Sequence, residues 1–282
     1  AVPTTLGRTF QAYQSFVKRD IRHLMSAAEE MKTLNLGGTA IGNTINATPE
    51  YLENITAFVS EEVGIAFTQA DDLFDATQNV DGFVRVSAAI KTAAVNLSKM
   101  SNDLRLLSSG PKAGIGEINL PAKQNGSSIM PGKVNPVIPE VVSQVAFRVI
   151  GNDLTITMAA ESGQLELNAF EPIIFHSLFE SIDCLTHAVA TLTANCITGI
   201  QANEMVCYKQ VEESAGIATV LCPTIGYQKA SAIAKESLET GKTVRELVLE
   251  KGLLTIAETD SILDLKHMAG IPAAMWLRDK VI

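Results

Sequence analysis

Aromatic residues are scarce in this sequence. They make up 5% of its 282 residues, whereas hydrophobic residues of all kinds make up 46%. Most of the apolar residues are Ala, Leu, Ile and Val, which suit close-packed helices better than a β-sandwich. We therefore expect an all-α protein built as a bundle of long helices.

Positive charge is also in short supply. The 22 Lys and Arg residues stand against 31 Asp and Glu residues, which gives a net charge of −9, and the sequence shows no Lys/Arg cluster to offset it. Such a chain would be repelled by a phosphate backbone. Nucleic acid is therefore not expected as a partner.

Cysteine is rare and carries no CxxC spacing. The four cysteines are Cys184, Cys196, Cys207 and Cys222, and they lie in apolar helical stretches. This context is typical of buried structural thiols, and a metal or redox role is the alternative. Free thiols of this kind fit a reducing cytoplasm.

The stretch 184–203 lacks Asp, Glu, Lys and Arg, but its His, Thr, Asn and Gln residues would make a membrane span too costly. A helix buried in protein, and no membrane partner, is the expectation.

Long helices are predicted by apolar residues that recur at steps of three or four. One stripe over 6–34 predicts a helix ended by Gly37-Gly38, and another predicts a helix over 80–108 ended by Gly110-Pro111. Thr48-Pro49-Glu50 predicts the start of a shorter helix that runs to Gly64.

Two later helical stretches, 137–160 and 173–200, carry few charges and need cover on most of their faces. We infer that partner subunits supply this cover in an obligate homo-oligomer.

Beyond residue 202 charges become denser and glycine and proline more frequent. We therefore predict a central helical-bundle domain over 1–202 and a small C-terminal helical domain over 203–282. The spacings Thr243 to Glu246 and Thr255 to Glu258 predict capping boxes in the small domain.

Glycine and proline rule out a continuous helix between residues 114 and 136. This region contains the polar string Gly126-Ser127-Ser128-Ile129-Met130-Pro131-Gly132-Lys133-Val134-Asn135-Pro136, in a loop next to rigid helices, where sites are often built. A phosphate-binding P-loop does not fit, because the spacing is one residue too long and Val134 replaces the required hydroxyl. An ordinary solvated turn is the other interpretation.

The whole string over 126–136 resembles the signature of the aspartase/fumarase superfamily, without a substitution. Segments 102–111, 116–118, 151–153 and 163–168 also resemble family segments, in the family's order. Within the superfamily, Asn119-Leu120-Pro121 and the stretches 137–141 and 163–165 look like the aspartase branch. The resemblance therefore implies a helical bundle of the aspartase/fumarase type, formed as a homotetramer.

The chemistry implied by this resemblance is the reversible deamination of L-aspartate to fumarate and ammonia, without a cofactor. Ser127 would be the base that takes the Cβ proton and so forms an aci-carboxylate intermediate. Lys133 would serve as a fixed cation, and Ser128, Lys133 and Asn135 would bind the substrate.

Gly126 and Gly132 would be the hinges on which the loop closes over the substrate. Glu140 matches a catalytic family glutamate that pairs with an upstream histidine; the alternative is a helix-start acid facing the dipole. The histidines are expected to be packing or surface residues, and no metal-ligand cluster appears in the sequence; they are His23, His176, His187 and His267.

Two departures from the family qualify these expectations. Family sites combine three separated segments from three subunits, and this sequence resembles only one of them; the second normally ends just before Ala-Val-Pro, with which this chain begins. A companion chain, a nicked precursor or a truncated sequence would each account for the N-terminal segments. If nothing supplies these segments, we expect the chain alone to be inactive. Thr44 also stands where the family has glycine, which puts in doubt a close backbone approach there. A fumarase that hydrates fumarate to L-malate, and a catalytically incomplete helical scaffold, remain the alternatives.

Overall fold

The computed structural model describes residues 2–124, 126–130, 132–264 and 268–269. The chain forms two compact units. One comprises Ala1–Ala12, Gly110–Asn119 and Gln201–Ile282, and the other Tyr13–Ser109 and Leu120–Ile200. The predicted domains, 1–202 and 203–282, are each continuous in sequence. The smaller unit, in contrast, also includes two earlier segments, Ala1–Ala12 and Gly110–Asn119. The predicted domain boundary stays a prediction.

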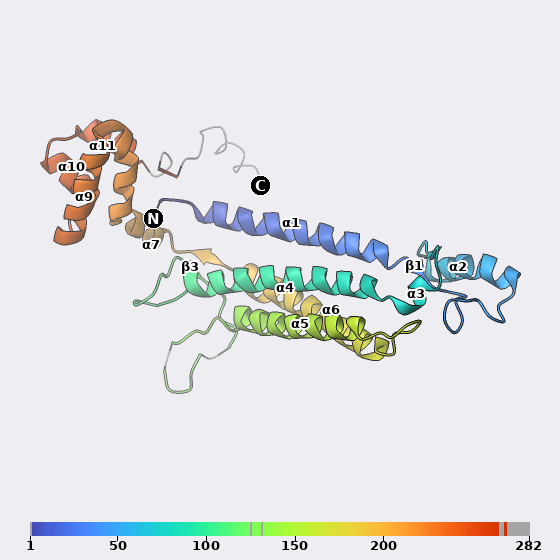
Figure 1. Ribbon diagram of the computed structural model, residues 1–282. Coiled ribbons are helices and arrows are strands. Elements are labelled where there is room, and N and C mark those ends of the chain that lie inside the picture. The colour runs from blue at the N-terminus through green and yellow to red at the C-terminus, as the bar shows by residue number, and fades with distance from the viewer. Residues whose placement is uncertain (1, 125, 131, 265–267, 270–282) are drawn as a thin grey trace. The chain divides into compact units, whose positions relative to one another are not determined.

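Three long helices form the centre of the larger unit: α4 (Asp81–Leu107), α5 (Val137–Glu161) and α6 (Glu171–Leu192), which lie side by side in Figure 1. Their packed faces contain mostly aliphatic side chains that are at most 1% exposed, including Ala94, Leu104, Val142, Ala146, Val149, Ile156 and Ile174. Polar contacts also cross between the helices: Ser87 donates to Asp153 over 2.8 Å. The predicted all-α bundle is confirmed.

Helix α1 (Leu6–Glu30) runs antiparallel to α4 in the larger unit. Three polar side-chain contacts join the two helices, and the residue numbers rise along α1 as they fall along α4. The pairs are Tyr13 with Asp103 (2.9 Å), Asp20 with Asn96 (2.9 Å) and Glu30 with Arg85 (2.8 Å). The α1–α4 contact thus contains specific hydrogen bonds between side chains.

The end of α1 differs from the prediction, because the helix stops at Glu30 and does not continue to Gly37-Gly38. Strand β1 (Thr33–Leu34) pairs in parallel with β2 (Thr68–Gln69), and the amide of Ala70 donates to the carbonyl of Leu34 over 2.9 Å. Because these backbone groups form hydrogen bonds between the two strands, they cannot also form the hydrogen bonds of a continued helix.

The next helix, α2 (Pro49–Val63), begins and ends as predicted. The Thr48 hydroxyl accepts from the amide of Tyr51 over 3.2 Å, and Gly64 adopts a left-handed conformation with φ +71°. A short helix, α3 (Asp75–Gln78), follows. The helix predicted to reach residue 200 ends early: α6 passes into a π-helical turn, η1 (Thr193–Ile197), which stops before Gly199.

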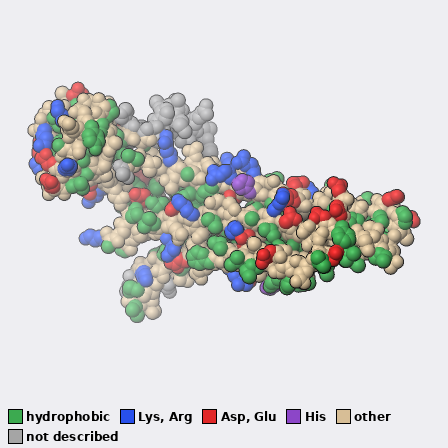
Figure 2. Space-filling view, in the orientation of Figure 1, with side chains coloured by type: hydrophobic (Ala, Val, Ile, Leu, Met, Phe, Trp, Pro, Cys, Tyr) green, Lys and Arg blue, Asp and Glu red, His purple; other side chains and the backbone are tan. Residues whose placement is uncertain are grey.

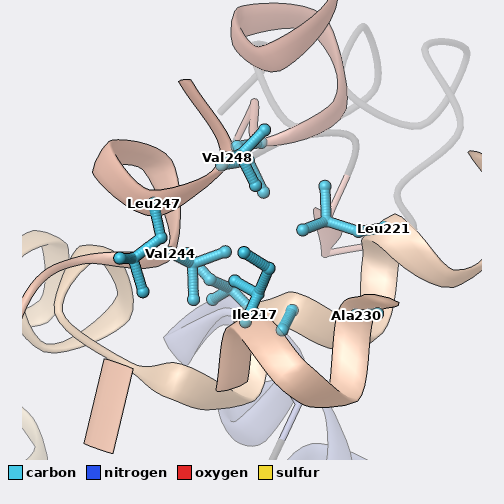
Figure 3. Close-up of a cluster of buried hydrophobic side chains, with 9 residues drawn as sticks. Ile217, Leu221, Ala230, Val244, Leu247 and Val248 are labelled. Atoms are coloured by element: carbon cyan, nitrogen blue, oxygen red, sulfur yellow. The ribbon is translucent and has the colours of Figure 1, made fainter. Parts of the chain in front are cut away.

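Among its described residues, the smaller unit contains short helices and one strand pair, β3 (Ile118–Asn119) with β4 (Gln201–Ala202). Its helices are α7 (Glu204–Glu212), η2 (Ala215–Leu221), α8 (Cys222–Ile225), α9 (Tyr227–Thr240), α10 (Val244–Glu250) and α11 (Ile256–Ile262). Figure 3 shows their shared core, in which Ile217, Leu221 and Val248 point toward one another.

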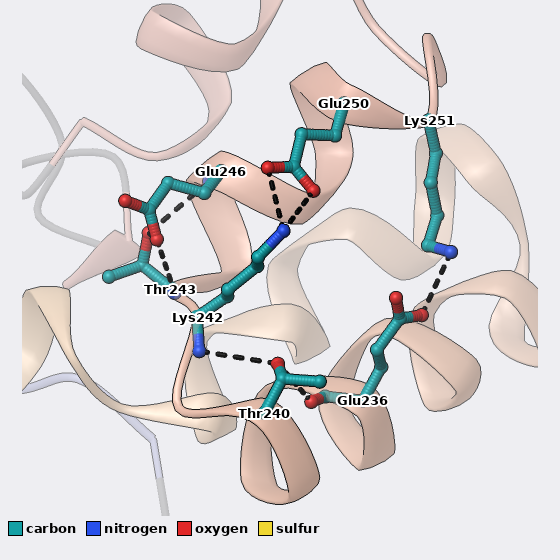
Figure 4. A network of polar contacts seen from close by, with 7 residues as sticks. All are labelled: Glu236, Thr240, Lys242, Thr243, Glu246, Glu250 and Lys251. Carbon is teal, nitrogen blue, oxygen red and sulfur yellow. Dashed lines mark hydrogen bonds and ion pairs between the residues drawn. The ribbon is translucent and has the colours of Figure 1, made fainter.

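Both predicted capping boxes are present. Thr243 accepts from the amide of Glu246 over 3.2 Å, and the Glu246 carboxylate accepts from the amide of Thr243 over 2.8 Å (Figure 4). Thr255 and Glu258 make the same pair of bonds. Lys242 adds an ion pair with Glu250 at 2.8 Å. Throughout the described part of the chain, no helix has the length and apolar character needed to cross a membrane.

Candidate active site

The predicted site loop closes on itself at a narrow neck. The amide of Gly126 donates to the carbonyl of Lys133 over 3.0 Å, and the side-chain amide of Asn135 donates to the carbonyl of Gly126 over 3.1 Å. Among the described residues between 120 and 136 there is no helix or strand. The neck therefore shapes a loop that leads directly into α5.

The two glycines of the loop meet different demands. A Cβ on Gly126 would lie 2.1 Å from the carbonyl oxygen of Lys133, so only glycine permits this close approach. Gly132 has open space around it but a φ of +77°, in the left-handed region. The proposed hinge role of both glycines stays a prediction.

Ser127 is half-buried, and its hydroxyl oxygen faces two backbone donors. The amides of Ile129 and Met130 each donate to Ser127 Oγ over 3.2 Å, whereas the neighbouring Ser128 is exposed. A serine in an ordinary turn can make such bonds. The same donors would also favour negative charge on the oxygen, because hydrogen bonds to a charged group are the stronger ones.

The loop places the backbone and the side chain of Lys133 in different settings. The carbonyl is held in the neck, while the side chain is exposed. Asn135 uses one side-chain N–H to close the neck, which leaves its second N–H for another acceptor. The substrate contacts predicted for both residues are untested by this geometry.

Glu140 lies in the first turn of α5, and its carboxylate is 3.9 Å from the guanidinium of Arg105 in the last turn of α4. Arg105 also donates to the side chain of Asn102 over 3.3 Å. Arg105 stands in the family-like segment 102–111 and was not among the predicted site residues. Of the described histidines, His23, His176 and His187, none lies within 4.0 Å of a carboxylate oxygen.

The structure thus joins Gly126, Lys133 and Asn135 at the neck of the loop and places Glu140 on the helix that follows. Within the described ranges, no group of three or more His, Cys, Asp or Glu side chains is arranged to share a metal ion. The arrangement offers a hydroxyl near two backbone donors, an exposed cation and a carboxylate. These are groups suited to binding an anionic substrate and to transferring a proton.

Comparison with known proteins shows the class. The family described as "Lyase" matches residues 1–151, and the family described as "Fumarase C C-terminus" matches residues 217–270. The chain belongs to this lyase family. The resemblance to the aspartase/fumarase superfamily is thereby confirmed.

Within the class, curated aspartate ammonia-lyases are similar over 95% of this chain. The Helicobacter pylori protein is 52% identical over 268 residues, the Escherichia coli K12 protein 50% and the Bacillus subtilis protein 47%. This chain spans only 57%, 56% and 56% of their respective lengths.

Two solved structures share the fold. A fumarate lyase:delta crystallin from Brucella melitensis bound to cobalt has a TM-score of 0.92 and 49% identity, over 95% of this chain and 58% of that chain. A class II fumarase from Schistosoma mansoni has a TM-score of 0.89 and 32% identity, over 95% and 59%.

Proposed function

We propose that this chain forms part of an aspartate ammonia-lyase, which converts L-aspartate reversibly to fumarate and ammonia. The observation that carries the proposal is the 52% identity to an aspartate ammonia-lyase over 95% of the chain, with the loop 126–136 inside the matched region. No cofactor is required by this reaction.

Ser127 is proposed as the base. Its oxygen takes the Cβ proton, and the C–H electron pair moves into the neighbouring carboxylate to form the aci-carboxylate. The electron pair then returns from the aci-carboxylate to form the Cα–Cβ double bond as the C–N bond breaks, and the protonated amino group leaves as ammonia with the electron pair of the C–N bond. The amides of Ile129 and Met130, each 3.2 Å from Ser127 Oγ, support this role because they would stabilise the deprotonated oxygen.

The remaining loop residues are proposed to bind and enclose the substrate. Lys133 supplies a cation, and Ser128 and Asn135 supply hydrogen-bond donors to the carboxylates. Gly126 and Gly132 permit the loop to close. Glu140 is proposed as a catalytic carboxylate, whose histidine partner would come from a family segment outside this chain.

A cytoplasmic homotetramer is proposed as the working form, completed by a companion chain or segment. Large apolar side chains on α5 and α6 support an oligomer, since Phe147 is 64% exposed, Leu154 61% and Phe179 61%. The four free cysteines are compatible with a reducing compartment.

The test combines this chain with the part of the Helicobacter pylori relative that it does not cover, and follows fumarate by its ultraviolet absorbance. We expect fumarate from L-aspartate and at least an about 100-fold loss in Ser127→Ala, the lower range for removing a general base. Ser162→Ala is the matched control, because this exposed hydroxyl donates only to the carbonyl of Met158 in its own helix.

The same assay separates the alternatives. Fumarate from L-malate and not from L-aspartate would establish a fumarase, which the class II fumarase fold match makes the second candidate. A correctly assembled protein that is silent with both substrates would be a scaffold and would end the proposal.

A further inference from the structure

Three cationic side chains occupy one face of α1. Lys18, Arg19 and Arg22 follow Ser15 at the helical spacing i, i+3, i+4 and i+7, and together these four residues line a shallow hollow that is open to solvent. The three cations are exposed. Figure 2 shows Lys and Arg side chains gathered beside a histidine over this part of the molecule. We call Lys18, Arg19 and Arg22 the basic face.

The basic face has no carboxylate partner. In the described part of the chain, no Asp or Glu oxygen lies within 4.0 Å of these three cations. The nearest acid in sequence, Asp20, is only 7% exposed and accepts two hydrogen bonds from Asn96 on α4. It is therefore committed to the α1–α4 contact.

This lack of partners contrasts with the cations of helices α4 and α5. Every lysine and arginine of α4 and α5 lies within 4.0 Å of a carboxylate; the pairs are Arg85 with Glu30, Lys91 with Asp153, Lys99 with Asp103, Arg105 with Glu140 and Arg148 with Glu180. In a chain of net charge −9, the basic face is thus a local concentration of uncompensated positive charge. Such a concentration attracts anions.

In the linear sequence Arg22 is separated from Lys18-Arg19 by Asp20 and Ile21, which hides the cluster. The helix removes this separation by turning Asp20 inward and by placing residues 18 and 22 one turn apart. The cluster is therefore a product of folding.

The chemistry and size of the basic face favour a small phosphate compound. Two guanidinium groups can each give two parallel N–H donors to phosphate oxygens, and the lysine adds a point charge. The face from residue 15 to residue 22 is about 10 Å long at 1.5 Å per residue, which matches two linked phosphoryl groups. A nucleic-acid backbone would extend beyond it onto a negatively charged protein.

We propose that the basic face of α1 binds a small molecule that carries two or more linked phosphate groups. This site lies outside the loop 126–136, and the proposal does not depend on the lyase reaction. The test is isothermal titration calorimetry of this chain with inorganic pyrophosphate at low ionic strength, where screening is weakest.

The decisive comparison uses two triple variants that remove the same charge. Lys18→Gln/Arg19→Gln/Arg22→Gln should bind pyrophosphate at least about tenfold more weakly, because it loses several charge-assisted hydrogen bonds. Lys112→Gln/Lys229→Gln/Lys235→Gln, at exposed positions in the smaller unit, should retain the original affinity. Far-UV circular dichroism should show the same helix content in both.

Further ligands and one conservative variant test the phosphate chemistry. Orthophosphate should bind more weakly than pyrophosphate, and Arg19→Lys/Arg22→Lys should lose affinity although it keeps the charge. The proposal is overturned if pyrophosphate gives no saturable binding, if the control triple variant loses as much affinity, or if citrate binds as tightly as pyrophosphate.

Discussion

Arg105 and Glu140 join the last turn of α4 to the first turn of α5, with Nη2 of the arginine 3.9 Å from Oε1 of the glutamate. Both side chains are about two-fifths exposed, at 43% and 39%. An exposed ion pair contributes little to stability. The effect expected of this contact is therefore on the orientation of the Glu140 carboxylate.

Replacing Arg105 should affect activity more than stability. In the assembled lyase, Arg105→Gln should lower kcat several-fold, while its free energy of unfolding changes by less than about 1 kcal/mol. Arg105→Lys should restore part of kcat. Arg148→Gln is the matched control, because Arg148 pairs with Glu180 away from the loop. An equal fall in kcat for the control would show that Arg105 has no specific role.

The neck of the loop should depend on Gly126. In Gly126→Ala the new Cβ would lie 2.1 Å from the Lys133 carbonyl oxygen, so the neck must open. We expect faster amide hydrogen exchange at residue 126 and faster proteolysis within the loop. Gly132→Ala meets open space and should cost only the about 1–2 kcal/mol of a left-handed conformation. Unchanged exchange in Gly126→Ala would contradict the neck.

The buried carboxylate of Asp153 should make Lys91 important for stability. Asp153 is 8% exposed and accepts from Ser87 and, over 2.5 Å, from Lys91. Lys91→Met removes the cation and should cost about 1–3 kcal/mol in urea unfolding, because a buried charged group loses a partner. Lys99→Met, whose lysine side chain is 68% exposed, should cost less than about 1 kcal/mol. Equal costs would show that burial of Asp153 does not matter.

The phenol of Tyr13 should make stability fall at alkaline pH. Burial, followed by the hydrogen bond to Asp103 and the negative charge of Asp103, raises its pKa above the usual 10.0. The folded state therefore holds this proton more tightly, so its contribution is complete below pH 10 and is lost as pH rises above it.

Unfolding free energies measured from neutral to alkaline pH, with Tyr13→Phe as the comparison, check this sign. The variant lacks the hydroxyl that donates to Asp103 over 2.9 Å and should show a smaller alkaline loss. A phenolate difference spectrum should also show one tyrosine of the wild-type protein titrating late. The same alkaline decline in both proteins would assign the loss to other groups.

Local signals in the sequence predicted local structure well. Thr48, Pro49 and Gly64 fixed the bounds of α2, and Thr243 and Thr255 each predicted a capping box that is present. The predicted end of α1 was wrong because the true end depends on the pairing of residues 33–34 with residues 68–69, more than thirty positions away in the sequence. An apolar stripe contains no information about such a partner.

In the candidate site, too, local features could be predicted from the sequence and contacts between distant residues could not. The family-like string located the loop, and its proposed roles rest on the resemblance. The neck between Gly126 and Lys133 and the approach of Arg105 to Glu140 come from backbone path and helix packing, which spacing alone does not specify. Thr44 is a similar case: it stands where the family has glycine and still adopts φ +57°, a strained conformation for a β-branched residue.

The neck at Gly126 also limits what closing the loop over a substrate costs in entropy. The ordering cost of a flexible segment grows with its length, and the Gly126–Lys133 hydrogen bond has already joined the ends of the part that would move. If the loop closes as proposed, the segment between these residues is the part whose ordering the substrate would have to offset. A larger share of the binding free energy then remains available for holding the reacting groups in position.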